Sequence, residues 1–263
     1  MAKRPPGFIF YDGPSRIDGA PIVGIATLKT KNKKTGPMVQ TWILRKNINP
    51  VRAINTGSDY SICGNCPLRG IIERTDYIGR NRGRLCYVKV PNAPNAIWGS
   101  FKRGNYPTYN RKLHKGLLIG RTLRLGAYGD PTAIPLPVWH PLLQLATGHS
   151  GYSHQWQDLR FRHWARYIMA STHTVQESAT AHLLGWRTFR TRITGQELEP
   201  GEINCPASTE GGNSTDCDSC CACDGNSLYQ LGAPAAPRKA SISLGIHGSP
   251  AIMKNKRLPG IHA

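Results

Sequence analysis

Eight cysteines fall into two short clusters, and cysteine at this density and spacing is typical of bound metal. The first thiol cluster is Cys63-Gly-Asn-Cys66, followed after 19 residues by Cys86-Tyr87. A turn that separates two cysteines by two residues points both sulfurs to the same side, so that they can share one ion. We therefore expect an iron–sulfur cluster or zinc at Cys63, Cys66 and Cys86.

The second thiol cluster is a C-x11-C-x2-C-x2-C array. Its four members are Cys205, Cys217, Cys220 and Cys223. Closed sites of four thiolates on small loops are more often structural zinc than iron–sulfur clusters, but the spacing accepts both. Cys221 adjoins the array and is interpreted as a spare thiol.

A disulfide framework is the alternative for both clusters. It is disfavoured because the N-terminal Met-Ala-Lys-Arg-Pro-Pro lacks the apolar region of a secretory signal, and because 263 residues bury enough core without cross-links. We expect a cytoplasmic protein, in the host cytoplasm if it is phage-encoded. No apolar stretch approaches the roughly 18 residues of a membrane span, so no membrane partner is expected.

The composition is strongly basic, with 34 Lys and Arg against 15 Asp and Glu and a net charge of +19. Such an excess repels itself unless a polyanion neutralises it, which favours nucleic acid as a partner. The alternative is a basic protein without such a partner. A membrane-surface role is less favoured, because no expected helix combines a cationic face with a strongly apolar one.

The segment 98–115 interleaves aromatic residues with cations, an arrangement that can stack bases while neutralising phosphates. Its candidate nucleic-acid-binding residues are Lys102, Arg103, Arg111 and Lys112. A helix start followed by a loop would contain the same residues.

Strands and helices alternate along the middle of the chain, which predicts βα units and a parallel sheet. Residues 1–20 are expected to form an irregular arm, and 22–28 and 39–44 a hairpin with a basic turn. Further strands are expected within 117–126, 148–156, 161–171, 186–193 and 240–247, with helices over 137–147 and 174–185. Residues 253–259 form a basic tail.

These elements predict an α/β fold: a partial (β/α) barrel with a β-rich N-terminal section and a cysteine-rich metal-binding insertion. The expected sections are 1–55 for the arm and hairpin, 56–200 for the partial barrel with the first thiol cluster, and 201–263 for the cysteine-rich segment, last strand and tail.

Around Arg124-Leu-Gly-Ala-Tyr-Gly129-Asp130-Pro131, followed by Pro137 and Trp139, the sequence resembles phage-encoded proteins of unassigned function with a barrel similar to that of radical S-adenosylmethionine (SAM) enzymes. The similarity covers roughly residues 55–195. In those proteins the cysteine motif precedes this turn, and its third cysteine adjoins an aromatic residue, as Cys86 adjoins Tyr87. The sequence departs from the usual C-x3-C-x2-C spacing, because a basic insertion separates Cys66 from Cys86.

The resemblance implies reductive cleavage of SAM at the first thiol cluster, giving a 5′-deoxyadenosyl radical. It also implies that Gly126, Gly129 and Asp130 lie near bound SAM, because barrel chemistry gathers at the carboxyl ends of the strands. The alternative is that Gly-Asp-Pro is a turn and helix N-cap. Under the same resemblance, the second thiol cluster would hold an auxiliary iron–sulfur cluster or a structural zinc.

Three histidines, His149, His154 and His173, lie on or just after expected strands, where a barrel places catalytic groups. Each is individually more typical of a packing residue. Nucleotide-phosphate loops, nucleophile elbows, H-E-x-x-H and deaminase motifs are missing from the sequence. The rival to a radical SAM-type enzyme is a non-catalytic, zinc-stabilised nucleic-acid-binding protein; a phage structural protein is less favoured.

Overall fold

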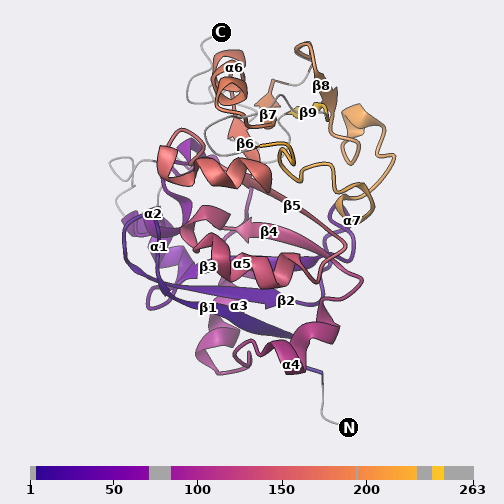
Figure 1. The fold of residues 1–263 in the computed structure, drawn as a ribbon. Helices are drawn as coiled ribbons and strands as arrows, with labels where there is room; N and C mark the ends of the chain where they lie inside the picture. The colour runs from indigo at the N-terminus through magenta and orange to yellow at the C-terminus, as the bar shows by residue number, and fades with distance from the viewer. Residues whose placement is uncertain (1–3, 71–83, 194, 230–238, 246–263) are drawn as a thin grey trace. The chain divides into compact units, whose positions relative to one another are not determined.

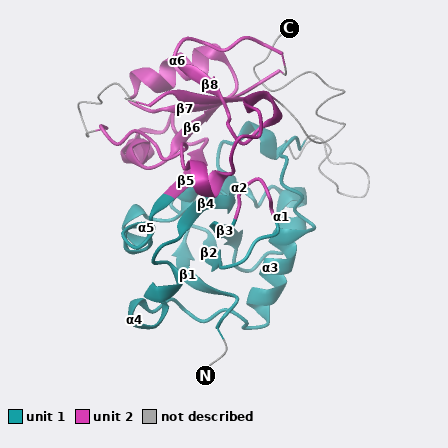
Figure 2. Cartoon of the chain, turned by 90° about the vertical axis from the view of Figure 1, so that its right-hand side faces the viewer, with its two compact units in different colours: residues 1–31, 37–148 teal, residues 32–36, 149–263 magenta. Residues whose placement is uncertain are grey.

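The computed structural model describes residues 4–70, 84–193, 195–229 and 239–245. The chain forms two compact units (Figures 1 and 2): unit 1 comprises residues 1–31 and 37–148, and unit 2 comprises residues 32–36 and 149–263. The boundary near residue 148 lies inside the section 56–200 that was expected to form one partial barrel. The predicted basic tail and most of the basic insertion lie outside the described residues.

Unit 1 is built on four strands in the order β1-β2-β3-β4. They are β1 (Gly7–Pro14), β2 (Pro21–Thr27), β3 (Val39–Arg45) and β4 (Thr122–Tyr128). The first three pair antiparallel and β3 pairs parallel with β4. The hairpin of β2 and β3 is therefore confirmed.

The prediction of an irregular arm over residues 1–20 was wrong, because β1 occupies much of that segment. Phe8 and Phe10 are both buried, and they alternate with side chains on the other face of the strand. This period-2 burial outweighs the surrounding Pro and Gly.

The helices of unit 1 are short. They are α1 (Pro50–Thr56), α2 (Tyr60–Cys63), α3 (Ala93–Lys102), α4 (Arg111–His114) and α5 (Leu136–Leu143), with 3-10 turns η1 (Pro67–Arg69), η3 (Lys115–Leu117) and η4 (Pro131–Ala133). Helix α5 confirms the helix expected over 137–147, although it ends at Leu143, and β4 begins later than the predicted strand because Lys115–Leu117 turns as a 3-10 helix.

Unit 2 is a parallel row of strands in the order β5-β6-β7-β9-β8. They are β5 (Gly148–Ser153, which begins at the boundary), β6 (Met169–Thr172), β7 (Thr188–Arg192), β8 (Glu202–Asn204) and β9 (Ser241–Gly245). Its helical elements are η5 (Leu159–Arg166), α6 (Val175–Leu183), η6 (Thr209–Gly211) and α7 (Cys217–Cys220). The α/β class with parallel strands is confirmed; neither row of described strands closes on itself, so the barrel remains a prediction.

Helix α6 follows the predicted capping pattern. The Thr174 hydroxyl accepts the Glu177 N–H at 3.0 Å, and the Glu177 carboxylate accepts the main-chain N–H groups of His173 and Thr174. A cap of this kind stabilises a helix by about 1 kcal/mol. The strand expected within 161–171 is confirmed as β6 at the end of that stretch, after the 3-10 helix η5 that Asp158 caps.

Candidate functional site

The first thiol cluster lies in unit 1, on the loop that follows β3. Cys63 ends α2 and Cys66 precedes η1. The main-chain N–H groups of Leu85 and Cys86 donate to the Leu68 oxygen at 2.9 and 2.8 Å, which returns the chain to this loop after the insertion. Cys66 and Cys86 both contribute to the raised pKa of Cys63, so the three thiols lie near enough for their charges to interact.

Burial raises the pKa of the Cys66 thiol to about 12, and burial also raises the pKa of Cys63 well above its usual value. The pKa of Cys63 is raised further by the Asp59 carboxylate, whereas the Arg84 guanidinium lowers it. Without a cation the two thiols are therefore protonated at neutral pH. A metal ion would have to displace these protons, as it does when thiolates become ligands.

The three thiols do not form a finished coordination sphere. No group of three or more His, Cys, Asp or Glu side chains within the described ranges is placed to hold a metal ion. Metal binding at either thiol cluster therefore requires the cysteine side chains to turn toward one point. Side chains rearrange in this way at sites where metal binding itself brings the ligands together.

The predicted Gly-Asp turn lies beside the first thiol cluster. The Asp130 N–H donates to the Ile62 oxygen at 2.6 Å, one residue before Cys63, and the Asp130 carboxylate contributes to the raised pKa of Cys66. The same carboxylate accepts the Thr132 N–H at 3.0 Å and the Thr132 hydroxyl at 2.8 Å. The alternative N-cap role of Asp130 is thus confirmed.

Gly126 and Gly129 serve packing at this turn. Both have left-handed backbone conformations, with φ of +70° and +84°. A Cβ added at Gly126 would lie 2.4 Å from the Gly129 oxygen, and one added at Gly129 would lie 2.7 Å from the Ile43 Cβ. Protein atoms therefore fill the spaces left by the missing side chains, and the glycines do not form an open cradle for SAM.

The second thiol cluster lies in unit 2, where main-chain hydrogen bonds tie its members to strands and turns. The Cys205 N–H donates to the Ser243 oxygen at 2.8 Å, and the Cys223 oxygen accepts the Gly151 N–H at 3.0 Å. Cys205 and Cys223 are buried in an apolar cluster, with Cys217 packed against it. The other buried members of that cluster are Met169, Phe189, Ala207 and Ile242.

These contacts order the cysteine-rich segment through apolar packing, so its order does not depend on a metal alone. Its apolar partners come from β6, β7 and β9, and cysteine itself packs as a small apolar residue. The Tyr152 hydroxyl also donates to the Cys223 sulfur at 3.4 Å. Cys221 has a left-handed φ of +43° at the end of α7, and burial together with Asp218 and Cys220 raises its pKa to about 11.

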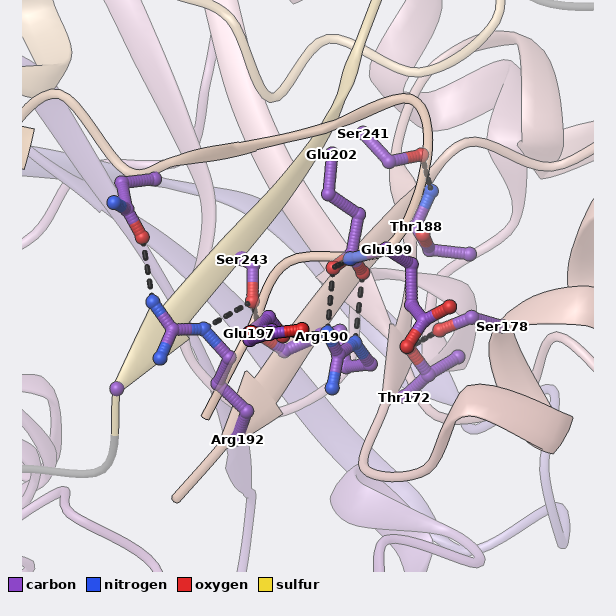
Figure 3. A network of polar contacts seen from close by, with 12 residues as sticks. Thr172, Ser178, Thr188, Arg190, Arg192, Glu197, Glu199, Glu202, Ser241 and Ser243 are labelled. Atoms are coloured by element: carbon purple, nitrogen blue, oxygen red, sulfur yellow. Dashed lines mark hydrogen bonds and ion pairs between the residues drawn. The ribbon is translucent and has the colours of Figure 1, made fainter. Parts of the chain in front are cut away.

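A buried ion-pair network holds the same segment to β7 (Figure 3). Arg190 binds the Glu202 carboxylate through Nε at 2.7 Å and Nη2 at 2.5 Å, and both side chains are 1% exposed. Arg192 donates to Asn204 at 2.6 Å and pairs with Glu210 at 3.1 Å. Arginines of β7 are thus engaged with the cysteine-rich segment, and the sequence analysis did not foresee these pairs.

The four predicted nucleic-acid-binding residues are all exposed, on or next to α3 and α4 of unit 1. The aromatic residues of the segment 98–115 are placed differently from these cations. Tyr106 is 8% exposed, and the Trp98 indole donates to the Arg45 oxygen at 3.0 Å. The arrangement therefore suits phosphate contacts better than base stacking.

Two of the three candidate histidines meet in unit 2, a pairing that could not be predicted from their spacing. His154 follows β5 and His173 follows β6, and their Nε2 atoms are 3.1 Å apart. His149 has a different hydrogen-bond partner: its Nε2 lies 2.8 Å from the main-chain oxygen of Tyr167. Neighbouring parallel strands bring residues that follow their carboxyl ends together, although 18 residues separate the two histidines in sequence.

Comparison with known proteins gives no relative: no protein-family model, curated protein or solved structure matches the chain. Among the helices of the described residues, none has the length and apolar character needed to cross a membrane.

Proposed function

We propose that the protein binds metal through Cys63, Cys66 and Cys86, as an iron–sulfur cluster or zinc, in a site related to that of radical SAM enzymes. The observation that carries the proposal is the return of Cys86 to the loop of Cys63 and Cys66 across the insertion. Two cysteines on one loop and a third that returns toward it, with the turn after β4 alongside, suit a cluster ligated at three irons.

The SAM part of the proposal rests on the sequence resemblance and on the position of the Gly-Asp turn. The Asp130 carboxylate is near enough to Cys66 to raise its pKa. A molecule bound to a cluster at Cys66 would therefore lie near Asp130. Since the glycines are packed against Ile43 and Gly129, a SAM site here would have to use other contacts. Whether SAM binds is therefore a separate outcome of the experiment from whether metal binds.

For the second thiol cluster we propose structural zinc. No Lys or Arg occurs between Arg192 and Arg238, whereas seven acidic residues do. They are Glu197, Glu199, Glu202, Glu210, Asp216, Asp218 and Asp224. Surplus negative charge attracts a divalent cation such as zinc, which undergoes no redox change. The same charge makes the reduction of an iron–sulfur cluster harder.

Nucleic acid is the second part of the proposed function, and the charge distribution supports it. No Asp or Glu lies between Asp76 and Asp130, a stretch that includes Lys102, Arg103, Arg111 and Lys112. A surface free of carboxylates attracts phosphates without internal competition. If the first thiol cluster holds zinc, the same surface supports the alternative of a non-catalytic nucleic-acid-binding protein.

The test is metal and sulfide content with the visible absorption spectrum, measured on full-length protein purified without oxygen. We expect iron and sulfide at the first thiol cluster, bleached by dithionite, and about one zinc at the second. The variant Cys66→Ser should lose the iron and keep the zinc. The matched control Cys221→Ser removes a thiol outside both predicted ligand sets and should lose neither.

Four outcomes are distinct. A brown protein that cleaves SAM after reduction supports the whole proposal, and one that does not cleave SAM supports only the cluster. A colourless protein with two zincs supports the nucleic-acid-binding alternative. A protein without bound metal, whose Cys66→Ser variant is unchanged, contradicts metal binding at the first thiol cluster.

A further inference from the structure

Two buried hydrogen-bond donors beside the first thiol cluster have no partner among the described residues. They are the Tyr128 hydroxyl and Nε of Arg84. The Tyr128 side chain is almost completely buried, at 3% exposure. A buried donor without an acceptor costs free energy, and native proteins contain few of them. An acceptor that forms when the site is loaded would remove this cost.

Strand β4 places Tyr128 at the loop of Cys63. Tyr128 is the last residue of β4 and pairs with Trp42 of β3. Two residues later, the Asp130 N–H donates to the Ile62 oxygen, which fixes the end of β4 against the residue before Cys63. Burial raises the pKa of Tyr128 well above its usual value, and the Cys63 thiol raises it next most strongly. The hydroxyl therefore keeps its proton at neutral pH and remains a donor.

The turn that returns the chain to the cluster places Arg84. Nη1 of its guanidinium donates to the main-chain oxygens of Cys86 and Val88, at 3.1 Å each. Burial acts to lower the pKa of Arg84, whereas the Cys86 thiol, its strongest charged neighbour, acts to raise it, and the net shift is upward. The guanidinium thus lies beside the segment that carries the third thiol, and neither of its two bonds uses Nε.

The Asp59 carboxylate is the nearby acceptor that could otherwise receive these donors. Its Oδ1 accepts from Arg69 at 2.7 Å, and its Oδ2 is buried without a partner in the described part of the chain. Neither Tyr128 nor Arg84 therefore bonds to this carboxylate, although all three groups lie near enough to Cys63 for their charges to interact. Since Arg69 balances the charge of Asp59, the charge of Arg84 is left to the thiols.

Metal binding creates the acceptors that these donors lack. A thiol accepts hydrogen bonds weakly, whereas a thiolate bound to a metal carries negative charge, and hydrogen bonds to charged acceptors are stronger. Three thiolates around one divalent cation leave one negative charge in excess. The Arg84 guanidinium carries the single positive charge that balances it.

We propose that, in the metal-loaded protein, the Tyr128 hydroxyl donates to the Cys63 sulfur and Nε of Arg84 donates to the Cys86 sulfur. This inference rests on the proposed metal site at the first thiol cluster and adds two positioning residues, which touch the ligands and not the metal. With zinc, the two bonds strengthen metal binding. With an iron–sulfur cluster they also raise the reduction potential, because hydrogen bonds to sulfur favour the more negative, reduced form.

The test is a titration of metal-free, full-length protein with Co²⁺, which occupies zinc-type thiolate sites and absorbs light through its bonds to sulfur. The variant Tyr128→Phe removes only the unpartnered hydroxyl. The difference from Cys66→Ser, whose first site lacks a ligand, separates the first thiol cluster from the second. We expect Tyr128→Phe to weaken Co²⁺ binding at the first thiol cluster by about tenfold. The stability of the metal-free protein should be unchanged or higher, because no bond is lost.

Tyr109→Phe is the matched control. The Tyr109 hydroxyl is also buried without a partner among the described residues, but its ring packs against Phe8 and His114. This variant should leave Co²⁺ affinity within about twofold, since no metal ligand loses a hydrogen bond. An equally small change in Tyr128→Phe overturns the bond to Cys63. So does a larger loss of metal-free stability in Tyr128→Phe than in Tyr109→Phe, because the hydroxyl would then already have a protein partner.

A second variant, Arg84→Gln, tests the bond to Cys86 and decides the matter if Tyr128→Phe does not fold. We expect it to weaken Co²⁺ binding by about tenfold, while Arg52→Gln, which removes the same charge from an exposed side chain of α1, has no such effect. Equal affinities in the two variants overturn the role of Arg84. Identical Co²⁺ uptake by the unaltered protein and Cys66→Ser contradicts the proposed metal site itself, whereas unchanged affinity at a site that does bind Co²⁺ overturns this inference alone.

Discussion

The two thiol clusters differ in the charge that surrounds them and in what holds their loops. In the first, Cys86 lies within a stretch without carboxylates between Asp76 and Asp130, whereas Cys63 and Cys66 precede it, and hydrogen bonds to Leu68 hold the returning chain at Cys86. The second lies in a stretch without cations, and buried arginines and an apolar cluster hold it. The two thiol clusters therefore differ in the charge of the chain around them and in their anchoring, which predicts different metals and different structural roles.

Substitution of one cysteine in each thiol cluster should give the largest difference between the two clusters, in metal content and in stability. We expect Cys66→Ser to lose its metal while unit 2 keeps its stability, because Cys66 belongs to unit 1. Cys223→Ser should lose zinc and loosen the loops between Cys205 and Cys223, whereas the Arg190–Glu202 pair and the apolar cluster should keep the rest of the segment in place. Metal analysis and hydrogen exchange measure both effects. Equal loss of protection in the two variants would contradict different roles.

The next contrast compares ion pairs in the two units. Glu202→Gln should destabilise unit 2 by about 3 kcal/mol, because Arg190 would remain buried without its carboxylate. The exposed Lys46–Asp12 pair of unit 1, at 2.8 Å, should contribute less than about 1 kcal/mol, as measured by Asp12→Asn. Chemical denaturation monitors both, with the exposed Glu197→Gln as a charge-matched control. A small effect of Glu202→Gln would mean that the pair is not what anchors the segment.

Acid should weaken unit 2 through the histidine pair. The folded pKa of His154, about 3, is below the unfolded value of roughly 6.5, so the unfolded state binds more protons in between. The stabilising contribution is complete above pH ~6.5 and falls as the pH drops toward 3. Denaturation of unit 2 at several pH values should show this decline, and His154→Gln should flatten it. An equal slope in the variant would assign the decline to other groups.

The sequence predicted elements whose signals are local. The hairpin of β2 and β3 and the cap of α6 at Thr174 and Glu177 each depend on residues within a few positions of one another. Even β1 carried a local signal in Phe8 and Phe10, which the neighbouring Pro and Gly obscured.

The candidate sites were predictable only in part. The return of the chain at Cys86 to the loop of Cys63 and Cys66 agrees with the expectation that the three cysteines share one ion, and the ion itself stays a prediction. The pairing of His154 with His173, and of Arg190 with Glu202, depends on which strands become neighbours and in which register. Spacing along one chain does not specify that register, so these contacts could not be derived from the sequence.

The smallest expected effect tests the surface of unit 1. Lys102→Gln removes one exposed cation from α3, and we expect a weaker affinity for duplex DNA or RNA with a salt slope smaller by about 1. Lys239→Gln removes the same charge, but from a lysine that pairs with Asp224 at 2.6 Å beside the second thiol cluster. This control should leave the slope unchanged, because its phosphate partner would have to compete with a carboxylate. Fluorescence anisotropy at several salt concentrations measures both slopes; equal decreases in the two variants would mean that net charge, and not the α3–α4 surface, determines binding.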